Sequence, residues 1–207
     1  EGGRVDVAML DAVYPAMASN IGMLYGERDD IPPRTGNRHG GLSLCPYNVD
    51  PTADGYVAII CNNDKHWQGL LTTMGRAEFA RDPRVRTMAD RVANMEFVDA
   101  MVADFTRTLT KAELSPLLLN NKVPFAPVRD LPEVMQDPVL HERGTLFEVD
   151  HPAYGRLTLH GSALRFPGTE PQPYSCSPSY GHDNVEIYGA LGLDETAIAR
   201  LRDEGTI

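Results

Sequence analysis

Two short stretches of the sequence concentrate side chains that could act on an anion or a carbonyl group. The first, Arg34–Gly41, places two arginines, Asn37 and His39 among glycines. Guanidinium groups bind anions through paired N–H donors, and donors held near a cleft also polarise a carbonyl. The same composition is typical of a solvated, glycine-rich linker. The pattern leaves both interpretations open.

The second stretch, Cys61–Asp64, lies where an apolar run ends and a helical pattern begins. At such a corner several backbone N–H groups and a carboxylate converge on one spot, which suits the binding of polar groups. A simple helix cap, with Asp64 complementing the helix dipole, explains the same residues. This pattern also leaves two interpretations open.

Other common catalytic and ligand-binding patterns are absent from the sequence. It contains no G-x-S-x-G elbow, no G-x-G-x-x-G loop and no P-loop. His182 and Asp183 follow Cys176 closely, but a turn residue before a helix is the simpler interpretation of His182. The histidines are scattered and no two have the i, i+4 spacing of a helical zinc site, which argues against a metal. They are His39, His66, His141, His151, His160 and His182.

Composition and charge exclude several classes of protein. The 207 residues are 42% hydrophobic and 23% charged, as in a globular chain of one or two domains. The net charge of −10 argues against a nucleic-acid or membrane-surface partner. Cys45, Cys61 and Cys176 have spacings that predict neither disulfides nor a zinc site, and no apolar run reaches the ~20 residues of a membrane span. We therefore expect a cytoplasmic protein, and the opening Glu1 suggests the interior of a longer one.

The elements that would position the two stretches form an α/β pattern. Alternating residues predict a strand over Arg4–Ala8, and helical spacing predicts a helix over Met9–Tyr25 that Pro15 kinks. The proline-rich segment Gly168–Gly181 predicts an extended arm. The other predicted elements are a hairpin of 46–51 and 56–61, a helix capped near Asn63 and closed by Gly75, helices over 94–109 and 110–120, a strand over 122–128, a helical turn over 131–134, strands over 146–150 and 157–160, and helices over 184–191 and 194–205.

Short motifs that resemble those of a known protein family are spread along almost the whole chain. The motifs are Arg4–Ala12, Gly36–His39 with Pro46-Tyr47, Pro51–Ile59, Asn63-Asp64 with Trp67, Arg91–Asn94, Val123–Leu131, Asp137-Pro138, Arg143-Gly144, Asp183-Asn184 and Leu191–Leu193. Together they resemble the class III CoA-transferase family, also called the CaiB/BaiF family. Its relatives include formyl-CoA transferase and α-methylacyl-CoA racemase.

The resemblance implies the C-terminal half of a two-domain protein. The fold would be a small α/β domain plus linker and C-terminal elements of a Rossmann-like large domain. Residues 1–33 would end the large domain and form a linker helix, 34–150 would be the small domain, and 151–207 would be a return arm and helices that pack on the large domain. The expected partner is a second copy in an interlocked homodimer, or a complementary N-terminal half.

The resemblance also implies a reaction. Family transferases use an aspartate that attacks an acyl-CoA thioester, forms a mixed anhydride, captures CoA as an aspartyl thioester and passes CoA to an acceptor acid. That nucleophile lies upstream of the match to Arg4–Ala8, so none of Asp6, Asp11 and Asp54 is assigned to the role. We expect the isolated chain to be inactive. Coenzyme A is then a substrate, beside acyl and acceptor carboxylic acids, and no tightly bound cofactor and no metal are expected.

Within the chain, the resemblance directs the loop of residues 61–64 toward the active site. Asp64 falls where the racemases hold a carboxylate and is the catalytic candidate. In place of the glycine-rich stretch of oxalate-type transferases the loop has Asn62–Asp64, and Gly40 replaces the proline of many members. The candidates for binding substrate or CoA are Asn37, Arg38, His39, Asn62 and Asn63.

Two other functions remain open. A half of an acyl-CoA racemase would move an α-proton with a histidine and an aspartate. A non-catalytic binding or assembly module would neither transfer CoA nor move a proton. Residues upstream of Glu1 would discriminate between the two enzymes, because they would contain the nucleophile or the acid–base pair.

Overall fold

The computed structural model describes residues 3–26, 31–164, 168 and 175–207. The chain forms two compact units, Glu1–Asp130 and Leu131–Ile207. The division of the whole protein into 1–33, 34–150 and 151–207 stays a prediction.

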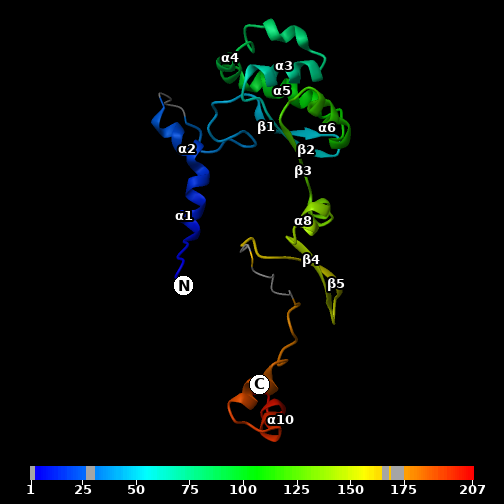
Figure 1. Ribbon diagram of the computed structural model, residues 1–207. Helices are drawn as coiled ribbons and strands as arrows, with labels where there is room; N and C mark the ends of the chain where they lie inside the picture. The colour runs from blue at the N-terminus through cyan, green and yellow to red at the C-terminus, as the bar shows by residue number, and fades with distance from the viewer. Residues whose placement is uncertain (1–2, 27–30, 165–167, 169–174) are drawn as a thin grey trace. The chain divides into compact units, whose positions relative to one another are not determined.

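A three-stranded antiparallel sheet forms the centre of the first unit (Figure 1). Its order is β1 (Tyr47–Thr52), β2 (Gly55–Ile60) and β3 (Phe125–Val128). The predicted hairpin is confirmed, and its tight turn uses Gly55 with a φ of 151°. The turn is tied to the following helices because the Asp54 carboxylate accepts a hydrogen bond from the Lys111 N–H at 2.8 Å.

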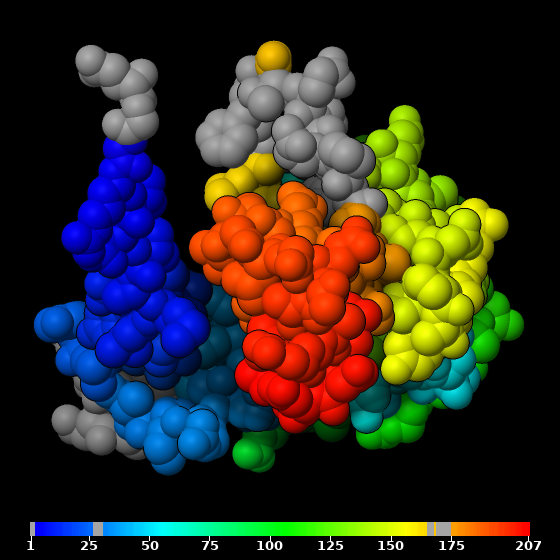
Figure 2. All heavy atoms as spheres, turned by 90° about the horizontal axis from the view of Figure 1, so that it is seen from below, coloured from blue at the N-terminus to red at the C-terminus, as the bar shows by residue number. Residues whose placement is uncertain are grey.

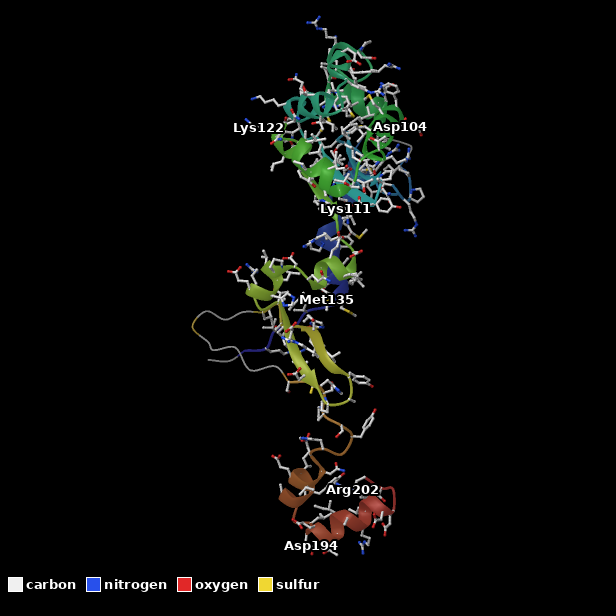
Figure 3. The ribbon with its side chains drawn as sticks, turned by 90° about the vertical axis from the view of Figure 1, so that its right-hand side faces the viewer. Asp104, Lys111, Lys122, Met135, Asp194 and Arg202 are labelled. Carbon is white, nitrogen blue, oxygen red and sulfur yellow. The ribbon has the colours of Figure 1, made fainter. Side chains whose placement is uncertain are left out.

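Helices gather around this sheet and bury its apolar residues (Figure 1). They are α3 (Asp64–Thr73), the 3₁₀ helix η3 (Ala77–Arg81), α4 (Met88–Ala93), α5 (Met95–Thr106) and α6 (Lys111–Asn120). The predicted cap of α6 is confirmed, because Thr110 and Glu113 form a capping box. Figure 3 labels Lys111, the first residue of the helix, and Lys122, which follows its end. The core they enclose contains Val57, Ile59, Trp67, Leu70, Leu71, Val85, Val98, Met101, Val102, Leu114, Leu118 and Val123.

The first residues of the chain form a helical run without any buried residue. The predicted helix is confirmed as α1 (Met9–Val13), η1 (Tyr14–Met17), α2 (Ala18–Gly22) and η2 (Met23–Tyr25), with Pro15 at the 3₁₀ turn. The predicted strand over Arg4–Ala8 is wrong for this chain, because a strand needs a partner for its backbone hydrogen bonds and none of the described segments pairs with it. The spheres of this stretch are blue in Figure 2.

The second unit combines a hairpin with short helices. The elements α7 (Leu131–Met135) and α8 (Pro138–Glu142) precede the antiparallel pair β4 (Leu146–His151) and β5 (Gly155–His160). The predicted final helices are confirmed as α9 (Asn184–Ala190) and α10 (Glu195–Asp203), and Figure 3 labels Asp194, the α10 cap, and Arg202 in its last turn. Residues 169–174 of the predicted arm Gly168–Gly181 lie outside the described residues, and 175–179 form no helix or strand.

Candidate functional site

Asp64 lies at the corner between β2 and α3. Cys61, which follows β2, is fully buried, and its N–H donates to the Pro46 carbonyl at 2.8 Å. Asn63 is the N-cap of α3, because its Oδ1 accepts a hydrogen bond from the His66 N–H at 3.0 Å. Asp64 is therefore the first helical residue rather than the cap, and its carboxylate is free for another role.

That carboxylate binds a buried arginine. Arg91 Nη2 donates to Asp64 Oδ1 at 3.0 Å. The Arg91 side chain has no solvent exposure, whereas 57% of the Asp64 side chain is exposed. The ion pair thus joins α3 to α4 and presents a mostly exposed carboxylate beside a buried positive charge.

Arg91 is held by groups from three other parts of the unit. Its Nε donates to the Cys45 carbonyl at 2.8 Å and its Nη1 to the Val85 carbonyl at 3.2 Å. Its Cζ lies 5.3 Å from the centroid of the Trp67 ring, which adds a cation–π contact. The capping box of Thr87 and Asp90 begins α4, the helix that carries Arg91.

Asn62 and Asn63, two predicted binding residues, contact each other beside Asp64. The Asn63 amide donates to Asn62 Oδ1 at 2.9 Å and lies 3.4 Å from His66 Nε2. Both asparagines are exposed. The structure therefore brings Asn62, Asn63 and Asp64 together at one surface corner.

The other predicted binding residues are fixed along β1 and α5. Asn37 Nδ2 donates to the Val49 carbonyl at 3.3 Å. The His39 ring stacks on Tyr47 with a centroid distance of 4.3 Å and an interplanar angle of 5°. Arg38 Nε donates to the Asp99 carboxylate at 2.5 Å, so its charge is already paired. Residues 37–39 are anchored to the sheet and α5, which is more than a solvated linker would show.

Next to this anchor lies a buried acid. Asp50 of β1 is 2% exposed, and its Oδ2 has no hydrogen-bond partner among the described residues. Burial, followed by the charge of Asp99, raises the pKa of the Asp50 carboxyl to about 7, while Arg107 acts in the opposite direction. Asp50 therefore changes charge near neutral pH, which no sequence pattern indicated.

A hollow of the described surface lies away from Asp64. A cavity of about 560 Å³ lies between the 32–42 segment and the junction of α4 and α5, and of the predicted site residues only Arg38 lines it. No described contact joins residues 37–39 to Asp64. The structure thus separates the predicted residues into two groups in the first unit.

The three cysteines and the pair His182–Asp183 are the other groups whose chemistry the sequence raised. Burial raises the pKa of both the Cys45 and the Cys61 thiol to about 12. In the second unit, His182 Nδ1 lies 2.5 Å from Asp183 Oδ1, and Cys176 Sγ lies 3.9 Å from the Asp150 carbonyl. Among the described residues, no group of three metal-ligating side chains occurs, and no helix there is long and apolar enough to cross a membrane.

Comparison with known proteins decides the family. A model described as CoA-transferase family III matches residues 1–184. The chain belongs to CoA-transferase family III. This confirms the resemblance seen in the sequence, and a solved CaiB/BaiF family protein from Brucella suis confirms the α/β fold: it matches with a TM-score of 0.72 and 27% identity over 92% of this chain and 48% of that one.

Two curated relatives are named for CoA transfer. Succinyl-CoA:mesaconate CoA-transferase of Haloarcula marismortui is 32% identical over 94% of this chain and 48% of its own length. Succinate–glutarate CoA-transferase of Agrobacterium fabrum is 33% identical over 72% of this chain and 37% of its own length. The chain therefore spans about half the length, or less, of these family members.

Sequence reasoning missed Arg91 as part of the site. Arg91–Asn94 was among the motifs of the family resemblance, but no local pattern linked it to Asp64. The two residues are 27 positions apart, and the link depends on how α3 and α4 pack.

Proposed function

We propose that this chain is the C-terminal portion of an acyl-CoA:carboxylate CoA-transferase. The observation that carries the proposal is the family match over residues 1–184. Two relatives named for transfer between dicarboxylic acids support it and make succinate, mesaconate and glutarate the first acids to test.

In the proposed reaction an aspartate outside these 207 residues is the nucleophile. Its carboxylate attacks the acyl-CoA thioester, and the C–S bond breaks to give a mixed anhydride and CoA thiolate. The thiolate then attacks the aspartyl carbonyl, which forms an aspartyl-CoA thioester and releases the donor carboxylate. The acceptor carboxylate attacks this thioester to give a second anhydride, and the returning thiolate attacks its acyl carbonyl. Acyl-CoA leaves and the aspartate is restored.

Asp64 is the residue of this chain that we propose to take part in catalysis. Its exposed carboxylate stands at the start of α3, beside the amides of Asn62 and Asn63. Asn37, Arg38 and His39 are proposed to shape the surroundings of CoA or substrate, with Arg38 on the wall of the 560 Å³ cavity.

The whole protein is proposed to complete the site with further chain. The partner is a complementary N-terminal half or a second copy in an interlocked homodimer. Support comes from the uncovered apolar residues of 3–25 and from the twofold length of the relatives. We place this enzyme in the cytoplasm, with coenzyme A as a substrate and no bound cofactor.

The direct test uses the full-length protein that carries this chain. It is incubated with succinyl-CoA and each acceptor acid, and the acyl-CoA products are separated by chromatography. We expect transfer to at least one dicarboxylate and an enzyme–CoA thioester that hydroxylamine cleaves. Solvent deuterium entering the α-carbon of a 2-methylacyl-CoA, without transfer, would favour the racemase instead, and neither reaction would favour a non-catalytic module.

Replacing Asp64 tests its role separately. Asp64→Asn in the full-length enzyme should lower kcat at least about tenfold, because the carboxylate charge is lost while an oxygen remains for Arg91. The melting temperature should stay nearly unchanged, since Asn63 rather than Asp64 caps the helix. An unchanged rate with a lowered melting temperature would assign Asp64 to folding only.

A further inference from the structure

We propose that Arg91 is a positioning residue of the active site, which holds the Asp64 carboxylate in one orientation and leaves Oδ2 for the reacting substrate. This inference rests on the proposed function, because it takes Asp64 as the group that meets the substrate. Arg91 would then contribute to catalysis only through its effect on Asp64.

The Arg91 guanidinium is fixed before Asp64 is considered. Two of its three nitrogens donate to main-chain carbonyls, Nε to Cys45 and Nη1 to Val85. Its face is packed near the Trp67 ring and the side chain is fully buried. A guanidinium is planar and its donors point in set directions, so fixing two nitrogens also fixes the direction of Nη2.

That fixed Nη2 determines where Asp64 points. It donates to Oδ1 at 3.0 Å, and no hydrogen bond from the described residues reaches Oδ2. A mostly exposed aspartate would otherwise sample several rotamers, and the bond removes that freedom. The mostly exposed carboxylate is thus held in advance through one oxygen and has no described hydrogen bond on the other, which is the arrangement of a preorganised catalytic group.

The exposure of the two partners separates this pair from the other ion pairs. Among the described residues it is the one pair whose cation is fully buried and whose carboxylate is mostly exposed. In the pair of Arg84 and Asp82, the arginine is itself 51% exposed and the contact stays within one loop. Burying a guanidinium costs free energy, which the hydrogen bonds to the two carbonyls and to Asp64 offset.

The test is a double-mutant cycle on kcat in the full-length enzyme, with Arg91→Lys, Asp64→Ala and the double variant. A lysine keeps the charge but cannot donate to two carbonyls and Asp64 at once. We expect Arg91→Lys to lower kcat about tenfold with KM for the acyl-CoA changed less than about twofold, and to have no further effect on kcat in the Asp64→Ala enzyme. Arg84→Lys is the matched control and should leave kcat unchanged.

Asp64→Glu keeps the test open if Arg91→Lys does not fold. It retains the charge on an exposed side chain but moves the carboxylate by one methylene, so positioning predicts a loss in kcat at an unchanged melting temperature. Full activity of Asp64→Glu would overturn the inference, as would equal losses from Arg91→Lys in both backgrounds. An inactive parent enzyme would instead show that the proposed function is wrong, and the role of Arg91 would fall with it.

Discussion

Asp50 is an acid whose surroundings oppose its charge. It is buried on β1, it lies near the Asp99 carboxylate, and its Oδ2 has no described hydrogen-bond partner. Arg107 is the cation that favours its ionised form, while Arg38 pairs with Asp99. The folded protein therefore keeps a proton on Asp50 up to a pH of about 7, the value to which its pKa is raised.

This proton predicts a stability that falls as the pH rises. Between the unfolded pKa of 3.8 and the folded pKa of about 7, the folded state holds the proton and the unfolded state has lost it. The free energy of unfolding should decrease over this interval and level off above it. Asp50→Asn cannot ionise, so it should remove this decrease and raise stability at pH 8 by on the order of 2 to 4 kcal/mol.

Urea unfolding of the full-length protein and of Asp50→Asn between pH 4 and pH 8 measures this effect. The two stability curves should diverge as the pH rises. Curves that stay parallel would show that Asp50 ionises normally inside the fold. Asp54→Asn is a useful contrast, because the hydrogen bond from the Lys111 N–H lowers the pKa of that exposed carboxyl.

At the scale of elements, α3 is placed by a close backbone contact with the segment that follows α6. A Cβ added at Gly69 would lie 2.3 Å from the Asn121 carbonyl oxygen and 3.3 Å from Val123 Cγ2. A main-chain oxygen cannot move aside as the end of a side chain does. The absence of a side chain at Gly69 therefore permits the packing that also sets the start of α3, where Asp64 lies.

Gly69→Ala should therefore destabilise the protein, although alanine is by about 1 kcal/mol the better helix former. We expect a net loss of roughly 2 kcal/mol and a lower kcat, because α3 must shift and take Asp64 with it. Thermal unfolding and steady-state rates of the full-length protein measure both effects. Gln68→Ala, at an exposed position of the same helix, is the control; a more stable Gly69→Ala protein would contradict the packing argument.

At the scale of the whole molecule, the first helical run exposes large apolar side chains, which folded proteins usually bury. At least 75% of the side chain is exposed at Val5, Met9, Leu10 and Tyr25. None of the residues 3–25 is fully buried. Exposed apolar side chains in this number are typical of an interface. This exposure agrees with a chain that matches 48% of its relative's length.

The 207 residues alone should therefore associate and should not transfer CoA. Size-exclusion chromatography is expected to show self-association, and a dye that binds apolar surface should fluoresce. Leu10→Glu should reduce both signals by placing charge on the apolar run, whereas Gln68→Glu, on an exposed part of α3, should not. A monodisperse, stable monomer, or a hydroxylamine-sensitive CoA thioester on this chain, would contradict the expectation.

The features that the sequence predicted correctly depend on residues a few positions apart. Thr110 and Glu113 cap α6, and Asn63 caps α3. Asp54-Gly55 forms the turn of the hairpin. Each of these contacts joins residues that are only a few positions apart in the sequence. Family motifs are likewise read from adjacent residues. The short helix α4 went unpredicted, although its capping box is also local.

The contacts that make the candidate site arise only when distant segments pack. Arg38 meets Asp99 across 61 positions, and Asp64 meets Arg91 across 27. The predicted strand at Arg4–Ala8 also depends on a distant segment. Its backbone hydrogen bonds need a partner strand, and none of the described segments pairs with it. Local hydrogen bonds are encoded by neighbours in sequence, whereas a buried charge, its partner and its pKa follow from the burial that folding creates.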